Sequence, residues 1–121
     1  MTARSMVEAV RYTCPVELTL DVVGGKWKPL ILWELRSRPR GFNALHAAIP
    51  SVSQKVLTQQ LRALERDGII SRTIHEGRVR TVTYELSQFG RTLHPVLDAL
   101  ARWGKSHYRD LGVALDWPLR V

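Results

Sequence analysis

A stripe of cationic and amide side chains recurs at helical spacing in the middle of the chain. Its members stand at positions i, i+3, i+4, i+7 and i+11, and they are Lys55, Thr58, Gln59, Arg62 and Arg66. Glutamine can pair with a base edge, lysine and arginine with guanine or phosphate, and threonine with either. A helix also fits the major groove of DNA. The pattern indicates a DNA-recognition helix, although residues 51–68 alone leave a solvated amphipathic helix open as the alternative.

The same segment has an apolar face that belongs in a core. That face carries Val56, Leu57, Leu61 and Leu64. Ser51 or Ser53 is expected to cap the start of the helix, Ser51 having Gln54 three residues on, and Gly68 is expected to end it. Because the amino end of a helix is positive, Ser53 and Gln54 would hold a phosphate or the first base there.

Composition favours one domain and a polyanionic partner. The 121 residues suffice for a single modest core. Eighteen Lys and Arg against eleven Asp and Glu give a net charge of +7, which suits DNA, RNA or an anionic membrane. Mere solubility is the alternative explanation of this charge. No apolar run reaches the roughly 18 residues of a membrane span, and no signal peptide is evident, so we expect a cytoplasmic protein without a membrane partner.

The sequence predicts neither an enzyme nor a metal or cofactor site. The single cysteine, Cys14, has no histidine near it in a catalytic pattern and no second cysteine for a disulfide or structural zinc. The four histidines form no close ligand motif, and core or surface roles are expected for them.

Elements on both sides of residues 51–68 must position this helix. Residues 1–13 are expected to be an arm, followed by a helix that ends at Gly24-Gly25. The nearly all-apolar segment 26–36 predicts the most buried helix, residues 37–41 a turn, and Phe42 to Ile49 a short helix ended by Pro50. A short helix joined so closely to the next one is typical of a helix-turn-helix.

After Gly68 the hydrophobic period changes from helical to alternating. Segments 69–75 and 79–86 are rich in β-branched residues and flank Glu76-Gly77, which predicts a β-hairpin. Its tip and flanks carry the basic residues Arg72, His75, Arg78 and Arg80. A helix-turn-helix followed by a basic hairpin predicts an α+β, mostly α, winged helix-turn-helix.

The region from Ser87 to about Leu111 predicts a final helix, with Ser87 as N-cap and Pro95 either bending it or marking the start of its regular part. Its apolar stripe is long for so small a domain, so we expect part of it to pack against a second copy of the chain. The alternative is that it folds back on its own domain.

Several blocks of the sequence, taken in order, resemble the HxlR-type family of bacterial transcription regulators, relatives of the MarR group. The blocks are Cys14-Pro15, GGKWK at 24–28, ILWELR at 31–36, SQKVLTQQLRALERDGII at 53–70 and TVTYELSQFGRTLHPVLDALARWG at 81–104. The resemblance implies an arm at 1–13, a DNA-binding core at 14–86 with a two-stranded wing, a dimerisation helix at 87–111 and a tail at 112–121. It further implies N- and C-terminal dimerisation helices, and a homodimer on a pseudo-palindromic operator in double-stranded DNA, more often repressing than activating.

By the same resemblance, the helix matching Ser53 to Arg66 enters the major groove and the hairpin matching His75 to Thr81 reaches the flanking backbone or minor groove. We therefore expect Lys55, Thr58, Gln59 and Arg62 to face the groove. Arg78 and Arg80 lie on the wing, and Lys26, at the start of the second helix, would sit near a phosphate. The short wing at 76–78 lacks the prolines that many relatives carry. A winged-helix interaction module without specific DNA binding is the alternative function.

Cys14 is the candidate regulatory residue, because cysteine at the Cys-Pro position is a thiol switch for oxidants, quinones or aldehydes in some members of the family. The cations Arg11, Lys26 and Lys28 are close in sequence and would favour the thiolate. The alternative is a small buried apolar residue. Tryptophans 27, 33 and 103 are expected in the core and dimer interface, or else around a small aromatic effector.

Overall fold

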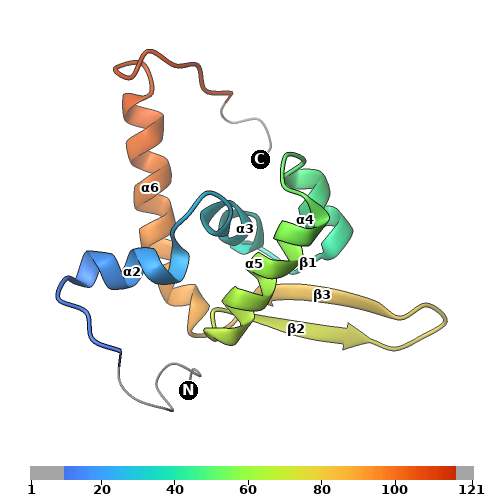
Figure 1. Ribbon diagram of the computed structural model, residues 1–121. Coiled ribbons are helices and arrows are strands. Elements are labelled where there is room, and N and C mark those ends of the chain that lie inside the picture. The colour runs from blue at the N-terminus through green and yellow to red at the C-terminus, as the bar shows by residue number, and fades with distance from the viewer. Residues whose placement is uncertain (1–9, 117–121) are drawn as a thin grey trace.

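The computed structural model describes residues 10–116, so most of the predicted arm and the end of the predicted tail lie outside the described residues. Figure 1 shows how the elements are arranged. In chain order they are α2 (Pro15–Val23), α3 (Lys28–Leu35), β1 (Arg40–Gly41), α4 (Phe42–Ala48), α5 (Gln54–Arg66), β2 (Ile70–His75), β3 (Thr81–Leu86), the 3-10 helix η1 (Gly90–Leu93) and α6 (His94–His107). The predicted winged helix-turn-helix is confirmed.

The core lies between α3, α4, α5 and the inner end of the sheet. Its fully buried side chains are Ile31, Leu32, Leu35, Leu45, Leu57, Leu61 and Leu64. The apolar face predicted for residues 51–68 is therefore the face that α5 buries. In α3 the apolar residues run nearly all round, but Leu30 stays exposed, so one side of this helix is open to solvent.

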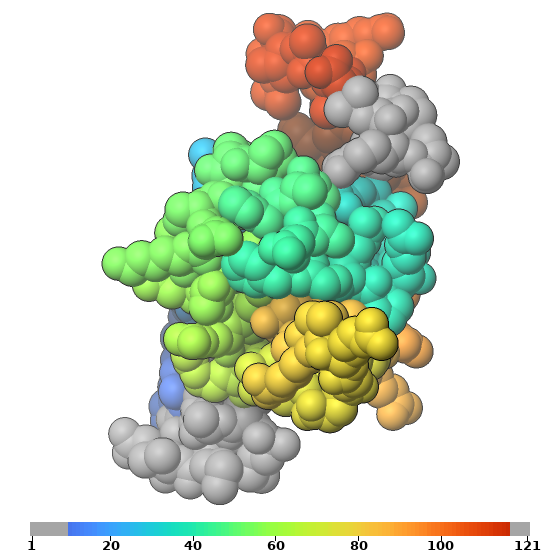
Figure 2. All heavy atoms as spheres, turned by 90° about the vertical axis from the view of Figure 1, so that its right-hand side faces the viewer, coloured from blue at the N-terminus to red at the C-terminus, as the bar shows by residue number. Residues whose placement is uncertain are grey.

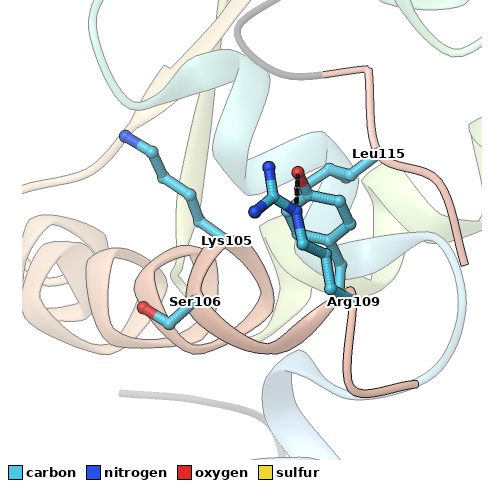
Figure 3. A pocket seen from close by; sticks show the side chains of 5 residues that line it. Lys105, Ser106, Arg109 and Leu115 are labelled. Carbon is cyan, nitrogen blue, oxygen red and sulfur yellow. Dashed lines mark hydrogen bonds between the residues drawn. The ribbon is translucent and has the colours of Figure 1, made fainter. Parts of the chain in front are cut away.

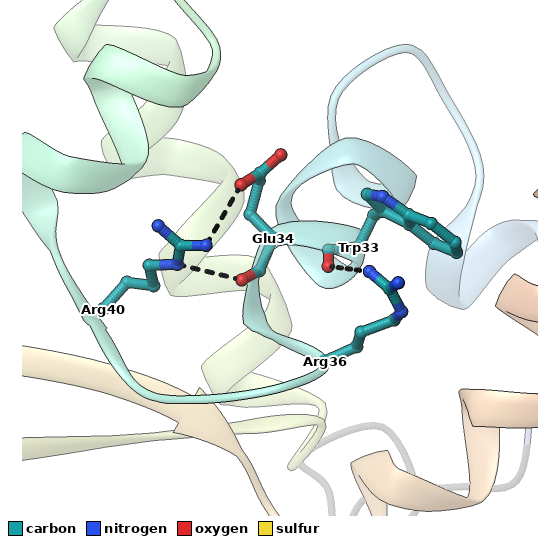
Figure 4. Close-up of polar contacts among 4 residues, drawn as sticks. All are labelled: Trp33, Glu34, Arg36 and Arg40. Carbon is teal, nitrogen blue, oxygen red and sulfur yellow. Dashed lines mark hydrogen bonds and ion pairs between the residues drawn. The ribbon is translucent and has the colours of Figure 1, made fainter. Parts of the chain in front are cut away.

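The sheet has three strands rather than the predicted two. β3 pairs antiparallel with β2 along the hairpin and with β1 on its other edge, where Arg40 is opposite Tyr84. Residues 40–41 were predicted to be part of a turn, which is wrong. The pairing satisfies backbone groups at the free edge of β3, and Arg40 anchors β1 because Nε donates to the Glu34 carbonyl at 3.1 Å (Figure 4).

Ser87 is not the N-cap of α6 as predicted, because that position is taken by Leu93; Ser87 instead precedes η1 and links it to the end of α5. The Ser87 hydroxyl donates to the Gly68 carbonyl at 2.6 Å and accepts from the Gly90 amide at 2.9 Å. Pro95 lies in the first turn of α6 and marks where the regular helix begins. A Cβ on Gly90 would lie 2.0 Å from the Ile69 carbonyl oxygen, so only glycine lets η1 approach the residue before β2 this closely. The α-helix ends at His107, four residues before the predicted end.

The apolar stripe of α6 is only partly buried within the described residues. Leu97 enters the core, whereas Leu100 is 55% and Trp103 58% exposed. On α2, Val16 and Leu20 are 63% and 60% exposed. We call Val16, Leu20, Leu100 and Trp103 the α2–α6 apolar residues. Within residues 10–116, no helix has the length and apolar character needed to cross a bilayer.

Candidate nucleic-acid interface

The two ends of α5 are set by residues that satisfy its terminal backbone groups. Ser53 is the N-cap, and its hydroxyl accepts from the Val56 amide at 3.1 Å. The predicted alternative, Ser51, is therefore not the cap. At the other end Gly68 has φ +76°, a conformation that favours glycine. Its amide donates to the Glu65 carbonyl and the Ile69 amide to the Leu64 carbonyl, which is the Schellman arrangement.

The predicted stripe on α5 faces solvent. Lys55, Gln59 and Arg62 are exposed, Thr58 is half-buried, and Gln54 is exposed at the first position of the helix. No carboxylate of residues 10–116 forms an ion pair with Lys55 or Arg62. These side chains therefore keep their donors for a partner outside the domain.

Two of the predicted contact residues already use part of their hydrogen-bonding capacity inside the helix. Thr58 Oγ1 donates to the Gln54 carbonyl at 2.8 Å, so this hydroxyl has only its lone pairs for a base or a water. The Ser53 hydroxyl accepts the cap bond and keeps its hydrogen, which it can donate to a phosphate oxygen. The arrangement favours Gln59 over Thr58 as the residue that donates to a base.

The hairpin is an exposed basic projection next to α5. All side chains from 71 to 80 are exposed, including Arg78 and Arg80 in the loop between the strands. Neither arginine forms an ion pair with a carboxylate of the described residues. His75 Nε2 lies 2.9 Å from Thr83 Oγ1 on the facing strand, which steadies the outer end of the hairpin. In Figure 2 the hairpin tip (yellow) points toward the viewer and α5 (light green) forms the left side.

An ion pair joins the hairpin to α5. Arg72 Nε lies 3.6 Å from Glu65 Oε2 in the last turn of the helix. The sequence pattern counted Arg72 among the wing cations but did not reveal this pairing, because the two residues belong to different elements. No spacing within either element carries a signal for it.

Lys26 lies in the turn ahead of α3, two residues before the helix begins, and not at its start as predicted. Its side chain is exposed, with Nζ 4.8 Å from the centre of the Trp27 ring. The ring and the ammonium attract each other, which holds the charge at the surface near the amino end of α3.

Cys14 occupies the N-cap position of α2 and is exposed, so the alternative of a buried apolar cysteine is wrong. The amides of Glu17 and Val16 in the first turn lower the pKa of the Cys14 thiol, because they stabilise the thiolate. The helix amides, rather than the neighbouring cations, are the cause. A groove of about 570 Å³ lies beside the thiol and is lined by Tyr12, Cys14, Val16, Glu17, Leu20 and Asp21.

A further hollow of about 270 Å³ lies at the carboxyl end of α6 (Figure 3). Lys105, Ser106 and Leu115 line it, and Arg109 Nε donates to the Tyr108 hydroxyl at 3.2 Å. None of the predicted DNA-contacting residues lines this hollow.

Three of the histidines contact protein atoms instead of one another: His46 the Val52 carbonyl, His75 Thr83, and His107 Asp110.

Comparison with known proteins identifies relatives along most of the chain. A family model described as HxlR-like helix-turn-helix matches residues 22–111. YybR of Bacillus subtilis, an uncharacterized HTH-type transcriptional regulator, is 41% identical over 109 residues, 85% of this chain and 87% of the relative. The structure is similar to the redox regulator HypR in its reduced form, with a TM-score of 0.79, 41% identity and coverage of 82% and 98%. It is also similar to a MarR-family transcriptional regulator of Porphyromonas gingivalis W83, with a TM-score of 0.74, 28% identity and coverage of 81% and 96%.

Proposed function

The chain belongs to the HxlR-like helix-turn-helix family of DNA-binding transcriptional regulators, which are not enzymes, and from this premise we propose that it acts as a homodimeric repressor. Two copies bind a pseudo-palindromic operator in the cytoplasm. Each copy places α5 in the major groove of one half-site. The two α5 helices are then about 34 Å apart, one turn of DNA.

One observation carries this proposal: the exposed face of α5 is built from cations and amides that have no carboxylate partner among residues 10–116, and an exposed basic hairpin lies beside it. Charged donors left without partners in a folded domain suit phosphate oxygens and the acceptor atoms of guanine. An interaction module would have no need of this composition along a helix that fits a groove.

The proposed division of labour follows from what each side chain can still donate. Lys55, Gln59 and Arg62 contact base edges or adjacent phosphates, and Thr58 accepts from a base or a water. At the positive amino end of α5, Ser53 and Gln54 hold a phosphate or the first base. The remaining cations contact phosphates beside the groove, and they are Lys26, Arg78 and Arg80.

We propose that two copies of the chain pair through the α2–α6 apolar residues. A monomer that exposes two large apolar side chains on each of two helices is expected to bury them in association. Since α2 and α6 lie on the opposite side of the domain from the hairpin tip (Figure 1), pairing through them leaves the wing free for DNA.

Control through Cys14 completes the proposal. The thiol is exposed, and the amides at the start of α2 lower its pKa, which raises the fraction of reactive thiolate near neutral pH. HypR is by its name a redox regulator. We propose that an oxidant or an electrophile of small size modifies Cys14 and thereby changes the affinity for the operator.

Footprinting of the purified protein on the DNA that flanks its own gene, with and without diamide, tests the proposal. We expect a protected pseudo-palindrome with half-site centres one helical turn apart, and an affinity that falls steeply with salt. A scrambled duplex of the same length is the control. Equal affinity for both duplexes would favour the interaction module instead, whereas an unchanged footprint with diamide would remove only the role of Cys14.

A further inference from the structure

A groove of about 320 Å³ lies where the loop after α3 meets the end of β3 and the start of α6. Its wall combines cationic and apolar side chains from these three segments. Three arginines, Arg36, Arg38 and Arg91, line it together with a single carboxylate, that of Glu85. The excess of positive charge in one small hollow indicates an anionic ligand, because a guanidinium presents a fork of donors that matches a carboxylate or a phosphate.

The existing partners leave most of these donors free. Arg91 Nη2 lies 3.8 Å from Glu85 Oε1, a long pair, and the Arg91 side chain is 62% exposed. Arg36 is held in position by Trp33, with Cζ 3.5 Å from the ring centre and Nη1 3.3 Å from the Trp33 carbonyl oxygen (Figure 4). A guanidinium carries five N–H groups, so one bond to a carbonyl leaves several for a ligand. Arg38 forms no ion pair with a carboxylate of the described residues.

The other lining residues and the volume of the groove indicate the size and polarity of the ligand that it could bind. Leu35, Pro39 and Leu86 supply apolar surface. His94 also lines the groove, and its Nε2 is buried without a hydrogen-bond partner in residues 10–116. An unsatisfied buried polar atom costs free energy, so a ligand that offered it a partner would gain affinity. A volume of about 320 Å³ is at the small end of ligand pockets.

We infer that this groove binds a small organic anion, in which a carboxylate or phosphate is attached to a compact apolar body. The anionic group sits between Arg38 and Arg91, and the apolar body rests on Leu35 and Leu86. In Figure 2 the cyan segment that holds α3 and its following loop forms the right side of the domain, opposite α5 on the left. None of the residues proposed to contact DNA lines this groove, and this inference goes beyond the proposed function and does not depend on it.

Such a ligand would bridge two parts of the chain. Arg36 and Arg38 follow α3, whereas Arg91 and His94 belong to η1 and the first turn of α6. Binding would fix the direction in which α6 leaves the winged domain. The binding of the anion does not require a dimer, but in the dimer proposed above, where α6 carries two of the α2–α6 apolar residues, a bound ligand would act on assembly rather than on α5 itself.

Isothermal titration calorimetry on the full chain without DNA tests the inference. The probes are benzoate and phenyl phosphate, with benzamide as the uncharged isostere of benzoate. We expect one site per chain for at least one of the two anions, and binding of benzamide weaker by about tenfold or more, because the uncharged amide cannot form a charge-assisted hydrogen bond with a guanidinium. The double variant R38Q/R91Q should weaken anion binding by at least the same factor.

The matched control is R102Q/R109Q, which removes the same charge from exposed positions on α6 and beyond it. It should change the dissociation constant by less than about twofold. Circular dichroism establishes that both double variants are folded. The inference is overturned if neither anion binds saturably, if benzamide binds as tightly as benzoate, or if the control weakens binding as much as R38Q/R91Q. A loss of DNA affinity in R38Q/R91Q without any loss of anion binding would also overturn it.

Discussion

Arg72 Nε lies 3.6 Å from Glu65 Oε2, and this ion pair ties the first strand of the wing to the last turn of α5. The two elements proposed to meet DNA are thus joined by side chains as well as by the short link through Gly68. Ser87 strengthens the same junction because its hydroxyl donates to the Gly68 carbonyl. The wing and α5, which are proposed to contact DNA, are therefore joined as one unit.

The Arg72–Glu65 pair should contribute only a little to stability. Its side chains are 48% and 36% exposed, so water screens the attraction. In a double-mutant cycle with R72Q and E65Q, we expect a coupling free energy of about 0.2–1 kcal/mol from urea unfolding. The longer and more exposed Arg91–Glu85 pair is the control and should couple less. A coupling of zero for Arg72 and Glu65 would show that their ion pair makes no net contribution to stability.

Gln59 and Arg78 should affect DNA binding in different ways. Gln59 is exposed on the α5 stripe, so Gln59→Ala should narrow the gap between operator and random DNA by about 1–3 kcal/mol, the contribution of one good base contact. Arg78 is exposed on the wing, so Arg78→Ala should weaken binding to all sequences and lower the salt slope by about one. Fluorescence anisotropy over a range of salt concentrations measures both.

Arg102→Ala is the control for Arg78→Ala, because it removes the same charge from an exposed position on α6. It should leave the slope of affinity against salt unchanged. Equal losses on operator and random DNA for Gln59→Ala would contradict its assignment to a base edge.

The sequence was sufficient for the elements that follow a local rule. The period of Leu57, Leu61 and Leu64 predicted which face of α5 is buried, and the alternation of apolar residues at 82–86 predicted the strand of the hairpin. Of the two roles predicted for Pro95, a bend in the helix or the start of its regular part, the structure shows the second. In each case the determining interaction lies within one element or between neighbours in the chain.

Features that depend on distant partners could not be predicted. β1 has only two residues, and what makes it a strand is the free edge of β3, more than forty positions later. The Arg72–Glu65 pair and the groove beside Arg91 likewise join separate elements. For the proposed DNA contacts, the sequence indicated only the types of residue. The structure shows in addition which hydrogen-bonding groups are already used, such as the Thr58 hydroxyl, which donates to the Gln54 carbonyl.

Cys14 should react faster at neutral pH than an ordinary cysteine. The amides of the first turn of α2 lower the pKa of its thiol, so the midpoint of its alkylation rate against pH should lie below that of an ordinary cysteine thiol. In urea the midpoint should return to that value. Because folding lowers the pKa of Cys14, the thiolate stabilises the folded state. This contribution is complete above the unfolded-state pKa and is lost as the pH falls through the folded-state pKa.

Cys14→Ser should bind the operator as the unmodified protein does but should no longer respond to diamide, which band shifts with and without the oxidant can measure. Because Cys14 is the only cysteine of the chain, no other thiol can replace it. A variant that still responds to diamide would place the sensitivity on another residue and remove the regulatory role of Cys14.

Leu100→Glu should convert the protein to monomers without unfolding it. Leu100 is 55% exposed in the single chain, so the glutamate remains hydrated there, whereas in a dimer it would be buried in an apolar contact at a cost of several kcal/mol. Sedimentation velocity measures the change of mass. The control Arg102→Gln alters the net charge by the same one unit but lies about 200° round the helix from Leu100, and it should stay dimeric. Since two linked α5 helices bind far more tightly than one, the Leu100→Glu monomer should lose about a hundredfold or more in operator affinity. A Leu100→Glu variant that remains dimeric would show that α6 does not pair through this residue.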